Sequence, residues 1–205
     1  MKPITRLHET PSQTAGPYVH IGLIPAQAGL DIFGHTLGDR LAGPEALGER
    51  IRIEGRVLDG AGVPCTDVLV ELWQANAAGK YDHPADRQER PLDPHLHGWG
   101  RTGTDFRTGV WAFDTVKPGS VTGRRGRPMA PHVNLFLASR GMNIGLSTRM
   151  YFSDEAEANA EDAVLNLVGA LRQTLIARRE DRGGRPAYVF DIHLQGPQET
   201  VFFDI

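Results

Sequence analysis

The sequence predicts an all-β protein, a two-sheet β-sandwich with a long N-terminal arm and a small helical insert. From residue 51 onward, short segments of alternating apolar and polar residues recur between turns rich in Gly and Pro. Residues 1–50 show no sustained period, and residues 153–180 have helical spacing instead. We therefore expect residues 1–50 to be an arm ordered by contact with another chain, and residues 51–205 to form the sandwich.

The first strands follow from period-two alternation. Residues 51–59 alternate Ile and Val with Arg and Glu, which predicts a half-buried strand that ends in the turn DGAG at 59–62. The segment 67–75 is apolar on both faces, which indicates a central strand. Further strands are expected at 109–116, 132–139 and 144–152.

The helical insert follows these strands. Ser153 is placed to cap a helix that begins with DEAEANA, and 163–180 predicts one or two short helical turns. The strand pattern returns at 187–195, and 200–205 is expected to close the chain as a strand. One short helix is also expected in the arm, near 37–42.

Composition excludes several classes of protein. The net charge is −3 and no basic block stands out, so nucleic acid is not an expected partner. No run approaches the roughly 18 apolar residues of a membrane span, and the N-terminus lacks the apolar segment of a secretory signal. A single cysteine, Cys65, excludes an intramolecular disulfide and fits a reducing cytosol. We expect a cytoplasmic protein without a membrane partner.

The residues alone offer no complete catalytic or metal-binding set. His132 and Asn134 point to one face of a strand, where two His would give a metal two imidazoles, but only one is present. The sequence His95-Leu96-His97 is the one His-x-His, and it lies in a Pro- and Gly-rich loop without further ligands at suitable spacing. Cys65 has no neighbouring His that could activate it.

Four long segments resemble the intradiol ring-cleaving dioxygenases. They are ETPSQTAGPYVHIGL (9–23), GRVLDGAGVPCTDVLVELWQANAAGKYDH (55–83), TVKPG with PMAPHVNLFLASRGMNIGLSTRMYF (within 115–152), and YVFDIHLQGPQETVFFDI (188–205). The resemblance covers nearly the whole chain. Within the family it is strongest to alpha subunits, which pair with a homologous beta subunit in an αβ hetero-oligomer.

The resemblance also bears on the metal. Catalytic chains of this family hold Fe(III) with two Tyr and two His, because a hard cation favours phenolate oxygen. The matching positions here are His132, Asn134, Gln88 and Val121, or Ser120 if the gap is placed differently. Three of the four ligands are therefore missing. The resemblance implies that this chain binds no metal and that the beta subunit holds the iron.

The four tyrosines of the chain do not replace the missing ligands in this interpretation. Tyr18 and Tyr81 fall in family segments that do not bind iron. Tyr151 and Tyr188 lie on expected strands, where packing in the core is the simpler role.

The resemblance implies a supporting role at the substrate cavity, with no catalytic residue on this chain. The cavity contributions of the family fall on Thr14, Gly16, Pro17 and Arg140. Gly lets the backbone approach a ligand, Pro fixes the chain beside it, and a guanidinium suits a carboxylate-bearing aromatic substrate. The implied reaction is cleavage of 3,4-dihydroxybenzoate (protocatechuate) by O2 to 3-carboxy-cis,cis-muconate.

Two other hypotheses remain at this point. The chain could be a transthyretin-like module that binds a small molecule or a protein without catalysis, although such a carrier has no need of the long arm. It could also be a self-sufficient dioxygenase with an unusual ligand set, against which Gln88, Val121 and Asn134 argue. The number of αβ units and the exact range of aromatic substrates do not follow from the sequence.

Overall fold

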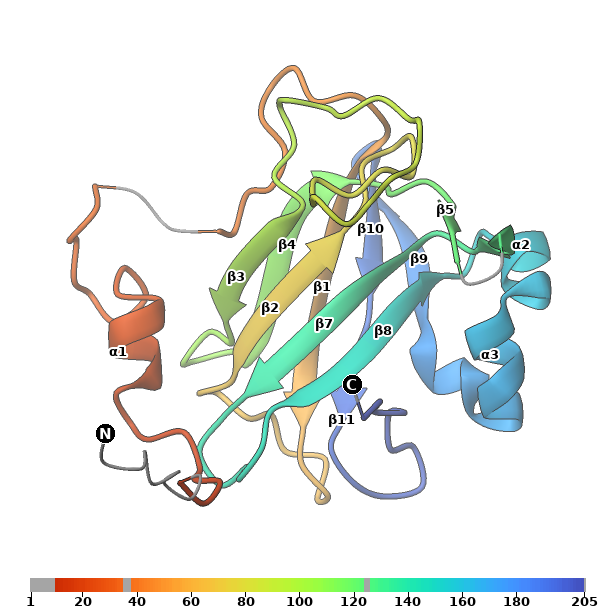
Figure 1. Ribbon diagram of the computed structural model, residues 1–205. Helices are drawn as coiled ribbons and strands as arrows, with labels where there is room; N and C mark the ends of the chain where they lie inside the picture. Colours follow the sequence, from red (N-terminus) through yellow and green to blue (C-terminus); the bar gives the residue numbers. More distant parts are fainter. Residues whose placement is uncertain (1–9, 35–37, 124–125, 205) are drawn as a thin grey trace, which may run out of the picture.

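The computed structural model describes residues 10–34, 38–123 and 126–204, and it is mostly β-structure (Figure 1). The strands are β1 (Arg50–Leu58), β2 (Leu69–Gln74), β3 (Trp99–Gly103), β4 (Val110–Val116), β5 (Val121–Thr122), β6 (Pro128–Met129), β7 (His132–Ala138), β8 (Leu146–Phe152), β9 (Ile176–Arg182), β10 (Arg185–Val189) and β11 (Ile192–His193). The helices are α1 (Val19–Leu23), α2 (Ala156–Glu161), α3 (Ala163–Val168) and a 3₁₀ segment (Gly169–Leu175). None of these helices is long and apolar enough to cross a membrane.

The expectation of two separate sheets holds only at the level of a mostly β fold. Hydrogen bonds link nine strands into one curved sheet in the order β11-β1-β10-β9-β8-β7-β2-β3, with β4 also paired to β1. Strand β9 joins the two halves into one sheet. It pairs first with β8, in parallel, and then with β10, antiparallel. The two edge strands β3 and β4 lie close together, so the sheet is nearly closed.

The core lies between the two halves of this sheet. In β1 the predicted alternation is confirmed, since Ile51, Ile53 and Val57 are fully buried. They pack with Phe113 of β4 and with apolar residues of β2, β7 and β8 in one cluster. Such burial is the main stabilising term of the fold.

The arm divides into two parts. Leu41 and Ala46 are buried in the main core, so residues 38–50 pack on the domain of their own chain. By contrast, α1 buries none of its residues. The helix expected near 37–42 is wrong for the described residues, because 38–39 form a bend and Arg40 and Ala42 form isolated β-bridges.

The helical insert differs from the prediction in its cap and in its length. The hydroxyl of Ser153 accepts a hydrogen bond from the amide of Arg179 and caps no helix. Asp162 caps α3 instead, accepting from the amides of Val164 and Leu165. Figure 1 shows α2 and α3 outside the sheet, on the side of β8 and β9.

One helix prediction and one strand prediction near the C-terminal end need correction. The helical expectation for 163–180 is wrong for residues 176–180, which belong to strand β9. Residues 200–204 were expected to be a strand, but they form only one bridge, between Phe203 and Ser147. Residue 205 lies outside the described residues.

Candidate functional site

The candidate site lies where β7, β8 and the segment after β2 meet. His132 and Asn134 are two residues apart on β7 and face the same side, as the sequence predicted. The antiparallel register places Arg149 of β8 directly opposite Asn134. Tyr81, from the segment after β2, stacks on Trp73 with ring centroids 5.7 Å apart and approaches the same face.

These side chains form a directional chain of hydrogen bonds. Nε of Arg149 donates to Oδ1 of Asn134 at 2.9 Å, and Nδ2 of Asn134 lies 3.5 Å from the Tyr81 hydroxyl. That hydroxyl lies 3.4 Å from Nε2 of His132, whose Nδ1 is 2.7 Å from the carbonyl of Ala130. A carbonyl only accepts, so Nδ1 carries the proton and Nε2 accepts from Tyr81. The lone pair of His132 that a metal would need is therefore directed at a phenol.

The protonation states agree with this arrangement. His132 is only 3% exposed, and burial, with the nearby charge of Arg149, lowers its pKa to about 4. Burial raises the pKa of Tyr81 above its usual value. At neutral pH both side chains are uncharged, so the site presents a hydrogen-bonded pair and no phenolate.

The other two positions that match family ligands are also occupied by internal contacts. Oε1 of Gln88 accepts from the amide of Thr122 at 3.1 Å, and its Nε2 donates to Asp86 at 3.1 Å. Val121 is buried in β5 and offers no polar atom. Neither side chain is free to turn toward a metal.

The residues present do not fit a ferric ion. Two neutral amides, a valine and a His–Tyr pair provide no anionic oxygen, and the Arg149 guanidinium adds a positive charge where a cation would bind. Among the described residues, no group of three or more His, Cys, Asp or Glu could hold a metal ion. That this chain binds no metal in solution stays a prediction.

Sequence reasoning missed Tyr81 and Arg149. The resemblance places Tyr81 in a segment without a role at the metal position, yet its hydroxyl reaches His132. Arg149 could have been found from the turn at 140–143, because a hairpin turn sets the register and thus the residue opposite Asn134.

The structure brings together some of the residues expected at the substrate cavity. The hydroxyl of Thr14 accepts from the amide of Gly141 at 2.7 Å and donates to the carbonyl of Ser139 at 3.3 Å. Thr14 therefore ties the arm to the turn that carries Arg140. The Arg140 guanidinium is 58% exposed and pairs with the carboxylate of Asp67.

Gly16 and Pro17 lie beside Thr14 on the arm. Pro17 is exposed, and no atom lies within 4 Å of the place where a side chain on Gly16 would begin. Both face open space in this single chain, and their contact with a substrate remains a prediction.

Comparison of the sequence with known proteins identifies the family to which the chain belongs. A family model described as Dioxygenase matches residues 33–196. A protocatechuate 3,4-dioxygenase alpha chain of Pseudomonas putida is 50% identical over 204 residues, covering 98% of this chain and 99% of the relative. The chain belongs to the dioxygenase family.

One further relative and one solved structure extend the comparison. A protocatechuate 3,4-dioxygenase beta chain of Burkholderia cepacia is 39% identical over 162 residues, covering 76% of this chain and 68% of the relative. The solved dioxygenase domain of a carbohydrate-binding fusion protein from Streptomyces sp. SirexAA-E superposes with a TM-score of 0.59 at 24% identity, covering 76% of this chain and 86% of that chain. The latter supports the fold, and the resemblance to the intradiol dioxygenases is confirmed.

Proposed function

We propose that this chain is the alpha subunit of a protocatechuate 3,4-dioxygenase, in which a homologous beta subunit holds the ferric ion. The observation that carries the proposal is 50% identity to an alpha chain over 98% of the sequence, against 39% over 76% for a beta chain. The hydrogen-bonded His132, Asn134 and Arg149 support it, because they suit a chain that leaves the metal to its partner.

The assembled enzyme would open the ring of 3,4-dihydroxybenzoate between its two hydroxyls. Both atoms of O2 enter the product, 3-carboxy-cis,cis-muconate, one in each new carboxylate. The iron of the beta subunit supplies this chemistry, and this chain supplies no catalytic residue. Its lone Cys65 fits a cytoplasmic enzyme.

The role we assign to this chain is to complete the wall of the substrate cavity. Arg140 is exposed on a turn and can reach beyond its own domain, where its guanidinium would bind the substrate carboxylate. Thr14 holds the arm against that turn and so places Gly16 and Pro17 nearby. The carboxylate of the substrate would compete with Asp67 for Arg140.

We also propose that the first part of the arm packs on the beta subunit. Exposed apolar side chains gather on it, with Tyr18 75%, Leu30 44% and Ile32 65% exposed. Single exposed apolar residues are ordinary, but a group on a segment that buries little of itself is typical of an interface. Residues 51–204 form the domain that carries this arm.

Co-expression tests the proposal. The chain is purified alone and with a protocatechuate 3,4-dioxygenase beta chain, and each sample is assayed for iron, for visible phenolate-to-iron absorption and for O2 uptake with protocatechuate. We expect colour, iron and activity only when the beta chain is present. A coloured lone chain with about one iron would support a self-sufficient enzyme. A stable, colourless chain that ignores the beta chain would support the binding module.

A further inference from the structure

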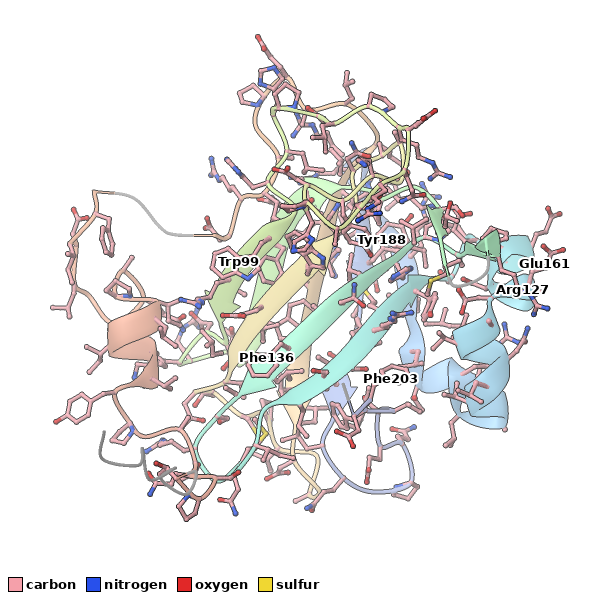
Figure 2. The ribbon with its side chains drawn as sticks, in the orientation of Figure 1. Trp99, Arg127, Phe136, Glu161, Tyr188 and Phe203 are labelled. Atoms are coloured by element: carbon pink, nitrogen blue, oxygen red, sulfur yellow. The ribbon has the colours of Figure 1, made fainter. Side chains whose placement is uncertain are left out.

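A cavity of about 500 Å³ opens beside Asn134 and Arg149, on the side of β8 that faces the helical insert. Its lining residues come from four places: the β5–β6 hairpin, β7 with β8, α3, and the C-terminal segment. In Figure 2, the labelled Arg127 and Phe203 mark the hairpin and the C-terminal segment that contribute to it. A cavity of this size suits a small organic ligand.

The polar end of this cavity is a guanidinium with a spare donor. Nε of Arg149 donates to Asn134, whereas Nη1 is buried and has no hydrogen-bond partner among the residues that the structure describes. A buried N–H without a partner is costly, and in a charged group more so. This donor therefore favours an anionic oxygen.

No acidic side chain is present among the described lining residues to neutralise Arg149. The buried carboxylate of Asp162 already accepts four hydrogen bonds. Its donors are the amides of Val164, Leu165 and Ala130 and the hydroxyl of Tyr151. The exposed Arg127 at the rim adds a second positive charge. The cavity thus attracts an anion from solution.

The remaining walls are mostly apolar. Met129, Val164, Leu167 and Phe203 line the cavity. A bare phosphate or sulfate would leave these walls without contacts, whereas a flat ring that carries one carboxylate would satisfy both ends. We infer that this cavity binds a small aromatic carboxylic acid without converting it, with the carboxylate on Arg149 and the ring against the apolar walls. The inference does not depend on Arg140 or on a partner chain.

Fluorine NMR with 4-fluorobenzoate tests this inference. The probe has no catechol hydroxyls, so the reaction proposed above cannot consume it. We expect saturable binding to the full chain, and at least about ten-fold weaker binding to Arg149→Gln, since a charge-assisted hydrogen bond is lost. Arg140→Ala should bind the probe as the natural chain does, which separates this site from the proposed substrate cavity.

A matched pair on the surface tests the same site without changing a buried residue. Leu167 lines the cavity and is 83% exposed, and Leu171 is 57% exposed on the same insert but does not line it. Leu167→Glu should weaken binding several-fold by repelling the carboxylate, and Leu171→Glu should not. If Arg149→Gln fails to fold, the difference in binding between Leu167→Glu and Leu171→Glu tests the site instead. Absence of saturable binding, or equal binding by all folded variants, would overturn the inference.

Discussion

Two regions of this molecule differ in the hydrogen bonding and exposure of their polar side chains. At the His132 site, a neutral imidazole, a phenol, an amide and the Nε of a guanidinium are linked by hydrogen bonds across strands. At the Thr14–Arg140 edge, the polar groups lie on an arm and a turn, and the guanidinium is mainly exposed. The hydrogen bonds of the first region lie within it, although Nη1 of Arg149 has no partner among the described residues, and the second region is open to a partner or ligand.

If this chain leaves the metal to its partner, as we propose, the first region shows how a dioxygenase fold can persist without a ferric site. The strand geometry that would present two ligands on one face is retained, so His132 and Asn134 still lie together. The hydrogen bonds among Arg149, Asn134 and Tyr81 now occupy that face. If the interpretation is correct, changes in the first region should alter stability and changes in the second should alter catalysis.

The largest effect is expected at Asp162, which supports the first region. This fully buried carboxylate accepts from the amides of Ala130 and Val164 and from the hydroxyl of Tyr151. Asp162→Ala would leave these donors without partners and should lower the free energy of unfolding by roughly 3 to 5 kcal/mol. Urea denaturation measures it. Thr14→Ala, in the open region, is the control and should lower the free energy of unfolding by less than about 1 kcal/mol. Equal losses in the two variants would show that the two regions do not differ in their contribution to stability.

The second-largest effect is expected in how the free energy of unfolding changes with pH. The pKa of His132 is about 4 in the fold and about 6.5 when unfolded, so the unfolded chain binds the extra proton. Stability should be unaffected above pH 6.5 and should fall as the pH drops toward 4, by about 3 kcal/mol in total from this group.

The measurement compares unfolding across pH 4 to 7 for the natural chain and for His132→Gln. The variant should lack this part of the pH dependence, whatever its absolute stability. His97→Gln, which changes an exposed imidazole, is the control and should keep it. An unchanged pH profile in His132→Gln would show that this imidazole does not stay neutral in the fold.

Arg140 should affect catalysis and leave the fold intact. In the αβ complex, Arg140→Ala should lower kcat/KM for protocatechuate by roughly 10- to 150-fold, the value of a charge-assisted hydrogen bond of about 1.5–3 kcal/mol. Lysine should recover part of this, because it keeps the charge but loses the planar fork. The loss should be smaller with catechol, which has no carboxylate.

Two variants separate substrate binding from the ion pair that Arg140 makes with Asp67. Asp67→Asn removes the pair but keeps the guanidinium, so it should retain most of the activity. Arg178→Ala removes another exposed guanidinium, one that pairs with Glu180, and should have no effect. Normal kinetics of an assembled Arg140→Ala complex would return Arg140 to the role of a surface residue.

The smallest effect is expected from adding a second imidazole beside His132. Asn134→His would place two imidazoles on one face of β7, but it supplies no phenolate and leaves the charge of Arg149 in place. The lone chain should still bind no stoichiometric iron after dialysis against ferric citrate. A tight, coloured ferric complex from this single change would show that Tyr81 can act as a ligand.

The parts of the fold that were predictable are those governed by local patterns. The alternation of Ile51, Ile53 and Val57 is a property of neighbouring residues, and the buried face follows directly from it. Strand β9 has the sequence IARREDR, with little apolar alternation, and its strand state depends on the distant partners β8 and β10. Strand β3, WGRTG, is similarly hidden by its two glycines.

The same distinction applies to the candidate site. The spacing of His132 and Asn134 on one strand shows that they share a face. The presence of Tyr81 depends on the path of the segment after β2, which no local pattern reveals. The partner of Arg140 was equally hidden, because Asp67 is brought to it only by the fold.

The pairing of β1 with β10 has a consequence for how the chain is made. These strands lie side by side in parallel, with Arg52 opposite Ala187. Strand β1 therefore cannot form these hydrogen bonds until the much later β10 has been synthesised. Contacts between residues so far apart in sequence slow folding and leave strand edges exposed meanwhile. The sheet cannot close until β10 has been made. We expect newly made chains to be prone to aggregation in that interval, and folding after release to be slow.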